Sequence, residues 1–189
     1  MHSGRFRVLL DACVLYPAPV RDLLLTFAGL HLYQPLWSEE IQNEWKRNLL
    51  ANRPDLSEDQ LNWTIGRMND SFPGANVTEY QHYINSISLP DEDDRHVVAA
   101  AIKGKADVIV TFNLRDFPQS TLSTFGIEVV HPDQFALNVI DLDENAAIKG
   151  FEKMAGRLKN PPLSDDDILS ALKKAGIRIG SKKLQNLLD

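Results

Sequence analysis

The chain has 189 residues, of which 43% are hydrophobic and 24% are charged, and its formal net charge is −6. This composition is that of an ordinary globular protein, which excludes disordered and fibrous classes. The negative charge argues against a protein that binds nucleic acid by electrostatic attraction alone. That argument weakens if cations bound by the acidic side chains neutralise part of the charge.

The cysteine content and the hydropathy pattern indicate a cellular compartment. The single cysteine, Cys13, excludes a disulfide within the chain and argues against a structural zinc site built from cysteines. Asp11 interrupts the apolar run from Val8 to Leu15, so that run lacks the form of a secretory signal. No segment approaches the roughly 18 apolar residues that span a membrane. We therefore expect a cytoplasmic protein that does not contact a membrane.

The first predicted element is a strand over residues 6–12, FRVLLDA, with Asp11 at its carboxyl end. A carboxylate directly after a buried strand is costly unless hydrogen bonds, an opposite charge or a metal ion compensate it. A helix over residues 20–28 and a short strand over residues 31–35 are expected to follow. Asp11 is therefore the first candidate functional residue.

A helix is predicted over residues 39–50, with Ser38 as its N-cap and an apolar face that includes Ile41 and Trp45. The acids at the start of this helix fit the first turn, where the helix dipole favours negative charge. Glu44 differs, because it lies past the first turn and borders the buried stripe. It is the second candidate.

The middle of the chain predicts alternating helices and strands. Asp93 and Asp94 precede a helix that Gly104 should end, and Asp116 follows the next strand. Alternation of this kind predicts an α/β fold, here a three-layer α/β/α domain with a mainly parallel sheet. The expected elements are a helix starting at 57, a strand over 77–80, the helix around 97–102, and strands over 108–111 and 126–130.

From about residue 136 the pattern is helical only, which predicts an α/β domain over residues 1–135 and a small helical extension over residues 136–189. Ser164 and Asp167 have the spacing of a capping box before an apolar run. The expected helices cover residues 132–138, 144–158, 164–174 and 181–188.

Four carboxylates from separate elements remain after these structural interpretations: Asp11, Glu44, Asp94 and Asp116. In open α/β sheets, ligands bind outside the carboxyl ends of the strands, where these acids are expected to converge. Like charges a few ångströms apart raise each other's pKa, so the cluster calls for cations. Carboxylate oxygens suit Mg²⁺ or Mn²⁺, and the chemistry that such ions favour is hydrolysis of a phosphodiester.

The ordered set of motifs resembles the PIN-domain ribonucleases, and DEDDRHVVAAA and TFNLRDF are its most specific parts. The resemblance covers about residues 5–135. It implies an α/β/α sheet and an acidic quartet that binds Mg²⁺ or Mn²⁺ and cuts RNA. Many such proteins are VapC-type toxins of toxin–antitoxin pairs, held inactive by a cognate antitoxin. The tail resembles the helical extension of one PIN subfamily and could bind the antitoxin, shape the RNA cleft or form a homodimer.

By position, the resemblance assigns metal binding and catalysis to Asp11, Glu44, Asp94 and Asp116. Thr111 and Asn113 become supporting polar groups. Asn113 occupies a position that is acidic in other members, which implies weaker binding of a second metal ion. In the DEDD run, Asp91 or Asp93 could take the role assigned to Asp94.

Basic residues near these motifs are candidates for contacts with RNA phosphates, although they could equally offset the acids. They are Arg95, Arg115 and Lys46. His96 could carry a proton or lie at the edge of the surface.

Two other function classes compete with a metal-dependent endoribonuclease. One is a phosphatase with Asp11 as nucleophile, but Cys13 stands where a haloacid-dehalogenase-like pattern has a second Asp. The other is a catalytically decayed PIN scaffold that only binds RNA or protein. The presence of all four acids argues against decay.

Overall fold

The computed structural model describes residues 6–158 and 161–189. Five strands form one sheet in the order β3-β2-β1-β4-β5, and every neighbouring pair is parallel. The predicted parallel α/β sheet is thereby confirmed. The strands are β1 (Arg7–Leu10), β2 (Gln34–Ser38), β3 (Asn76–Val77), β4 (Val108–Val110) and β5 (Glu128–Val130).

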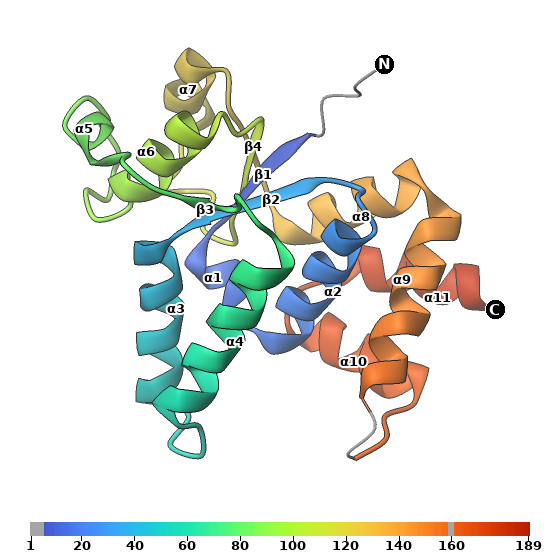
Figure 1. Ribbon diagram of the computed structural model, residues 1–189. Coiled ribbons are helices and arrows are strands. Elements are labelled where there is room, and N and C mark those ends of the chain that lie inside the picture. The colour runs from blue at the N-terminus through green and yellow to red at the C-terminus, as the bar shows by residue number, and fades with distance from the viewer. Residues whose placement is uncertain (1–5, 159–160) are drawn as a thin grey trace.

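Helices cover both faces of this sheet (Figure 1). Helices α5 (Gln81–Ile84), α6 (Arg95–Gly104) and α7 (Gln119–Leu122) lie on one side, the last followed by a short 3-10 turn, η1 (Ser123–Phe125). The opposite side holds α1 (Ala12–Leu15), α2 (Ala18–Gly29), α3 (Glu39–Asn52), α4 (Glu58–Ser71), α8 (Pro132–Leu142), α9 (Glu144–Arg157), α10 (Asp165–Lys174) and α11 (Ile179–Leu188).

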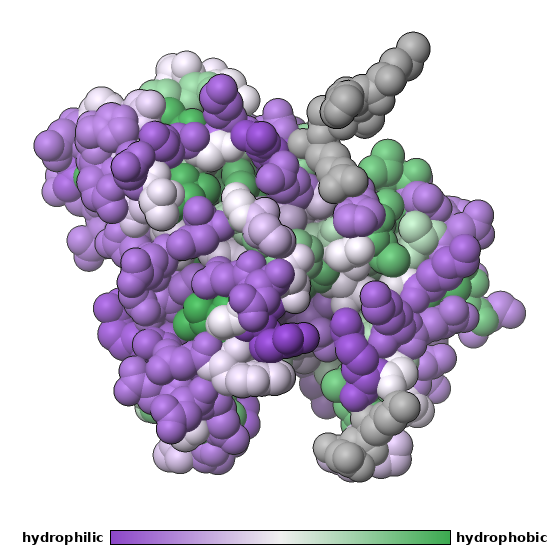
Figure 2. Space-filling view, viewed as in Figure 1, coloured by the Kyte–Doolittle hydropathy of each residue, from purple (hydrophilic) through white to green (hydrophobic). Residues whose placement is uncertain are grey.

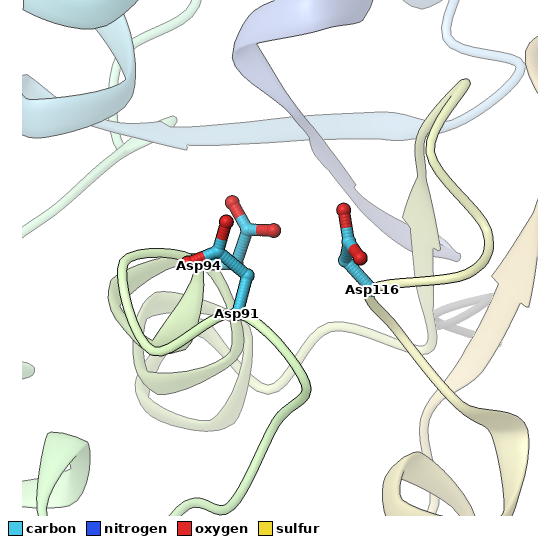
Figure 3. A group of neighbouring side chains, drawn as sticks. All are labelled: Asp91, Asp94 and Asp116. Carbon is cyan, nitrogen blue, oxygen red and sulfur yellow. The ribbon is translucent and has the colours of Figure 1, made fainter.

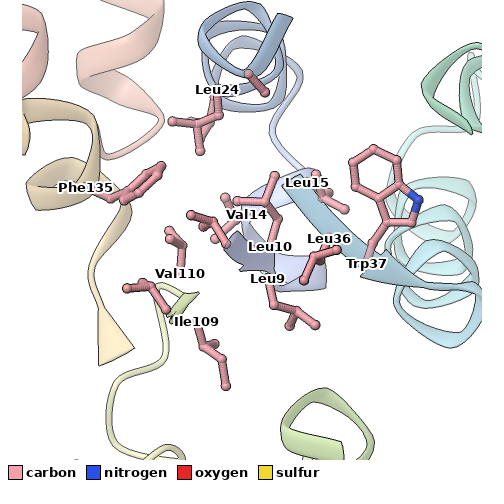
Figure 4. Packing of buried hydrophobic residues seen from close by; sticks show 14 of the residues in the cluster. Leu9, Leu10, Val14, Leu15, Leu24, Leu36, Trp37, Ile109, Val110 and Phe135 are labelled. Atoms are coloured by element: carbon pink, nitrogen blue, oxygen red, sulfur yellow. The ribbon is translucent and has the colours of Figure 1, made fainter. Parts of the chain in front are cut away.

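The core lies around the two central strands, β1 and β4. Leu9, Leu10, Ile109 and Val110 are fully buried, as expected for strands with helices on both faces. Figure 4 shows them beside apolar side chains of α1, α2, β2 and α8, including Phe135. Each large apolar side chain buried in this way stabilises the fold by roughly 1.5–3 kcal/mol. The rigid centre of the sheet therefore lies directly beneath the segments that carry Asp11 and Asp116.

Helix starts follow the sequence signals. The Ser38 hydroxyl accepts a hydrogen bond from the Ile41 backbone N–H, as predicted for the N-cap of α3. Ser164 and Asp167 form the predicted capping box at the start of α10. These local interactions fix where α3 begins, and thereby the position of Glu44 along it.

Some boundaries differ from the prediction. The third strand ends at Val77, because Glu79 adopts a left-handed conformation (φ 58°) and Tyr80 turns the chain into α5. The second strand starts at Gln34 rather than residue 31, because His31 is also left-handed (φ 64°). Gly104 is the last residue of α6, and the left-handed residue that ends this helix is Lys105 (φ 53°).

The C-terminal helices pack directly on the rest of the chain. Arg157 of α9 donates hydrogen bonds to Asp22 (3.1 Å) and Thr26 (2.6 Å) of α2. Helix α8 runs from residue 132 to 142 and so crosses the predicted domain division at residues 135 and 136, which stays a prediction.

On the face shown in Figure 2, hydrophilic side chains predominate and apolar ones form separate small patches. Among residues 6–158 and 161–189, no helix has both the length and the apolar character needed to cross a membrane.

Candidate metal centre

The strand order places two of the candidate segments side by side. Strand β1 lies next to β2 on one side and β4 on the other, so the order reverses between β1 and β4. Leu10 pairs with Val110 at the ends of these strands, and the Asp11 backbone N–H donates to the Val110 carbonyl at 3.1 Å. Ligands of open α/β sheets bind at such a reversal.

Asp11 is buried at this point, with 6% of its surface exposed. One carboxylate oxygen accepts from the Ala12 backbone N–H (2.7 Å), and the other accepts from the Thr111 hydroxyl (2.7 Å) and the Cys13 thiol (3.1 Å). Burial raises the pKa of Asp11; the hydrogen bonds from Thr111 and Cys13 oppose this shift, and the charge of Glu44 adds to it. The compensating donors are all neutral, so a cation would still stabilise the carboxylate.

Three further carboxylates lie close together, near enough to Asp11 for its charge to act on one of them. Oxygens of Asp91, Asp94 and Asp116 all lie within 4.8 Å of one another. Figure 3 shows Asp91 and Asp94 on the turn before α6, with Asp116 on the loop facing them. Asp91 accepts from the Asp93 backbone N–H at 2.9 Å, which shapes the turn. The structure thus brings Asp91, rather than Asp93, next to Asp94.

Asp94 sits at the N-cap position of α6, yet its side chain makes no capping hydrogen bond. Burial and then the charges of Asp11, Asp91, Asp116 and Glu44 raise its pKa to about 7. The carboxylate is therefore not used to stabilise the helix start. It lies in the negative field of the other acids instead.

Hard oxygen donors with excess negative charge fit a divalent cation such as Mg²⁺. Asp91, Asp94 and Asp116 could hold the ion together, and the charges of Asp11 and Glu44 also act on Asp94. We refer to these five residues as the acidic cluster. Among the described residues, the arrangement gives each of the four acids selected from sequence a place in or beside one group.

The supporting residues predicted from sequence lie beside the acidic cluster. Thr111 is fully buried and links two segments, because its hydroxyl donates to Asp11 and accepts from the Asn113 backbone N–H at 3.0 Å. The Asn113 side-chain amide donates to Asp116. Both residues therefore hold carboxylates of the acidic cluster in position.

The predicted RNA-contacting residues differ in their surroundings. Arg95 pairs with Glu92 (3.1 Å), and Lys46 pairs with Glu58 (3.3 Å). Arg115 is exposed on the loop between Asn113 and Asp116. Arg95 and Arg115 each stand next to an acid of the acidic cluster in the sequence, and a contact with RNA stays a prediction for all three residues.

The interpretation of His96 as a residue at the edge of the surface is wrong, because the side chain is buried. The residue is 8% exposed, and its ring lies between Glu40 and Glu44 of α3. Burial by itself would lower the pKa of His96, but the Glu44 and Glu40 carboxylates outweigh that effect and raise it. Sequence reasoning missed this contact because it joins α6 to α3. The one available signal was the spacing of Glu40 and Glu44, four residues apart on one helix face.

Comparison with known protein families identifies the family of this chain. The family model described as "PIN domain" matches residues 7–115, more than half of the chain, so the chain belongs to the PIN-domain family. The model described as "VapC50 C-terminal domain" matches residues 132–185. The predicted resemblance to VapC-type PIN proteins with a C-terminal helical region is confirmed.

One curated relative shares its name with the C-terminal family model. Over 79 residues the chain is 42% identical to the protein named "Putative ribonuclease VapC50" from Mycobacterium tuberculosis. The match covers 42% of this chain and 47% of that protein, and so spans about half of the relative's length. No solved structure matches the chain.

Proposed function

We propose that the protein is a metal-dependent endoribonuclease and the toxin of a type II toxin–antitoxin pair. The observation that carries the proposal is the convergence of five carboxylates at the β1/β4 reversal, where burial and the charges of the other four raise the pKa of Asp94 to about 7. Membership of the PIN family and the ribonuclease named as its relative support RNA as the substrate.

In this proposal the acidic cluster divides into three roles. Asp94 and Asp116 bind Mg²⁺ or Mn²⁺ directly, and Asp11 supplies a buried charge held by Thr111. Glu44 adds a ligand from α3, and Asp91 adds a carboxylate from the turn. A divalent ion bound here would lower the pKa of a water and stabilise developing charge on the phosphate.

The proposed partners are RNA, a cognate antitoxin and a second copy of the chain. We assign contacts with RNA phosphates to Arg115, which is exposed beside Asp116, and to Arg95 and Lys46 as further candidates. A cognate antitoxin is proposed from the VapC-type family, and a homodimer is compatible with the helical extension. Neither partner is needed for the cleavage test.

The test is cleavage of a mixed RNA pool by the purified protein with Mg²⁺, with Mn²⁺ and with EDTA. We expect cutting with either ion, none in EDTA, and a loss of at least about 100-fold in Asp94→Asn, since metal stabilisation is worth several kcal/mol. The control is Asp166→Asn, which removes one exposed acid from α10. Equal cutting in EDTA, or by Asp94→Asn, would overturn the proposal.

A further inference from the structure

A buried histidine lies between the acidic cluster and a second glutamate. His96 Nε2 is 3.6 Å from a Glu44 carboxylate oxygen, and His96 Nδ1 is 3.7 Å from a Glu40 carboxylate oxygen. Both glutamates belong to α3, and His96 belongs to α6. The imidazole ring therefore bridges two helices through opposite ring nitrogens.

The bridge extends beyond Glu40. The Tyr80 hydroxyl donates a hydrogen bond of 3.0 Å to the same Glu40 oxygen that faces His96. Tyr80 is buried at the start of α5, so the Glu40 carboxylate is hydrogen-bonded to a buried side chain. A polar chain thus runs from Tyr80 through Glu40 and His96 to Glu44.

The burial of His96 requires an explanation. In the described part of the chain, Nδ1 of His96 is a buried polar atom without a hydrogen-bond partner, and its closest carboxylate is that of Glu40. Burying an unpaired polar group costs free energy, and an apolar side chain at this position would avoid that cost. An imidazole here is understandable if its task is to hold a carboxylate.

Glu44 is the residue that needs holding. Its side chain is 33% exposed and has several rotatable bonds, whereas Asp11 is held by three hydrogen bonds. Partners behind a metal ligand fix its orientation, and their loss typically weakens metal binding by about 10–100-fold. His96 stands in this relation to Glu44.

We propose that His96 is a positioning residue: it holds the Glu44 carboxylate toward the acidic cluster and is itself held by Glu40. The inference rests on the proposed function, because it takes Glu44 as part of a metal site. It assigns His96 no contact with substrate.

The test compares two amides at one position. In His96→Gln the side-chain amide nitrogen falls near the place of Nε2 and can still donate to Glu44. In His96→Asn the amide nitrogen falls near the place of Nδ1, so it can reach Glu40 but not Glu44. His82→Gln is the matched control, because His82 is exposed on α5.

The readout is Mn²⁺ binding to each purified protein, followed by calorimetry or by electron paramagnetic resonance of the free ion. We expect His96→Asn to bind about 10–100-fold more weakly than wild type, and His96→Gln to stay within about threefold. The control should match wild type. Circular dichroism and thermal melting establish that all variants are folded, so a loss of affinity is not a loss of structure.

The outcomes distinguish a failure of the positioning role from a failure of the metal site. If wild type binds Mn²⁺ and both His96 variants bind it equally well, the positioning role is overturned while the metal site stands. If Gln and Asn weaken binding alike, orientation through Nε2 is overturned. If wild type binds no Mn²⁺, the proposed function fails, and the positioning role fails with it.

Discussion

At Asp94, burial and four neighbouring carboxylates raise the pKa to about 7 from an ordinary value of 3.8. The side chain does not cap α6, so the chain gains no local stability from this arrangement. Without a cation, Asp94 is partly protonated near neutral pH. Binding of Mg²⁺ or Mn²⁺ should therefore release protons.

This pKa predicts a pH dependence of stability in EDTA. Between about pH 4 and pH 7 the folded protein keeps the Asp94 proton, whereas the unfolded chain has lost it. Because the folded state binds more protons, the free energy of unfolding falls as pH rises through this window. We expect a contribution of about 1–2 kcal/mol after solvent screening. Urea unfolding at several pH values measures it, and an identical slope in Asp94→Asn would contradict the assignment.

Asp11→Asn should abolish RNA cleavage and leave the protein folded. The asparagine oxygen can still accept from the Ala12 backbone N–H, but the buried negative charge is lost. Cleavage assays measure the first effect, and circular dichroism with thermal melting measures the second. Wild-type activity in the folded variant would exclude Asp11 from the site.

The sequence predicted the residue types of the site better than its details. A carboxylate directly after an apolar strand needs compensation, which selected Asp11 from the local pattern, whereas Asp116 was selected by the ordered set of motifs. The DEDD run could not be resolved, because a turn stabilised by the hydrogen bond from the Asp93 N–H to Asp91 decides which acids face inward. The burial of His96 depends on α3, which is distant in sequence.

At the level of elements, the long amphipathic helices were predictable and the short ones were not. Helices α1, α5 and α7 have four residues each, too few to show a periodic pattern. Helix α1 matters for the site, because its N-cap is Asp11. Gly176, in the turn between α10 and α11, packs against the loop that follows β4. A Cβ added at Gly176 would lie 2.7 Å from the ring of Phe112.

Gly176→Ala should destabilise the protein by about 1–3 kcal/mol. The residue has a φ of +101°, and the added methyl group would meet the Phe112 ring. Gly66→Ala is the matched control, because Gly66 lies in exposed α4 with no neighbour within 4 Å of an added Cβ. That control should gain up to about 1 kcal/mol from helix propensity. Equal effects of the two substitutions on urea unfolding would contradict the packing.

For the whole molecule, the C-terminal helices are joined to the rest of the chain by specific polar contacts. Asp133 of α8 is buried, and its two carboxylate oxygens accept from the Ile179 N–H (3.0 Å) and the Gly180 N–H (2.9 Å) of α11. The residue at the N-cap position of α11, Arg178, makes no side-chain capping bond. Asp133 therefore caps α11 from another helix, which local sequence patterns could not reveal.

Asp133→Ala should lower the free energy of unfolding by about 1–3 kcal/mol, because the buried Gly180 N–H and the partly buried Ile179 N–H lose their acceptor. This corresponds to roughly 2–4 °C in melting temperature per kcal/mol. Asp141→Ala, on the same helix, removes only an exposed ion pair with Lys183 and should cost less than about 1 kcal/mol. A melting temperature equal to that of Asp141→Ala would contradict the capping role.

The metal centre is tested most directly by the anomalous scattering of Mn²⁺ in crystals of the wild-type protein grown with that ion. We expect a peak between the carboxylates of Asp94 and Asp116, on the side facing Asp11. The peak should disappear in crystals of Asp94→Asn. A map without a peak at the acidic cluster, or with Mn²⁺ bound only elsewhere, would contradict the metal centre on which the proposed function depends.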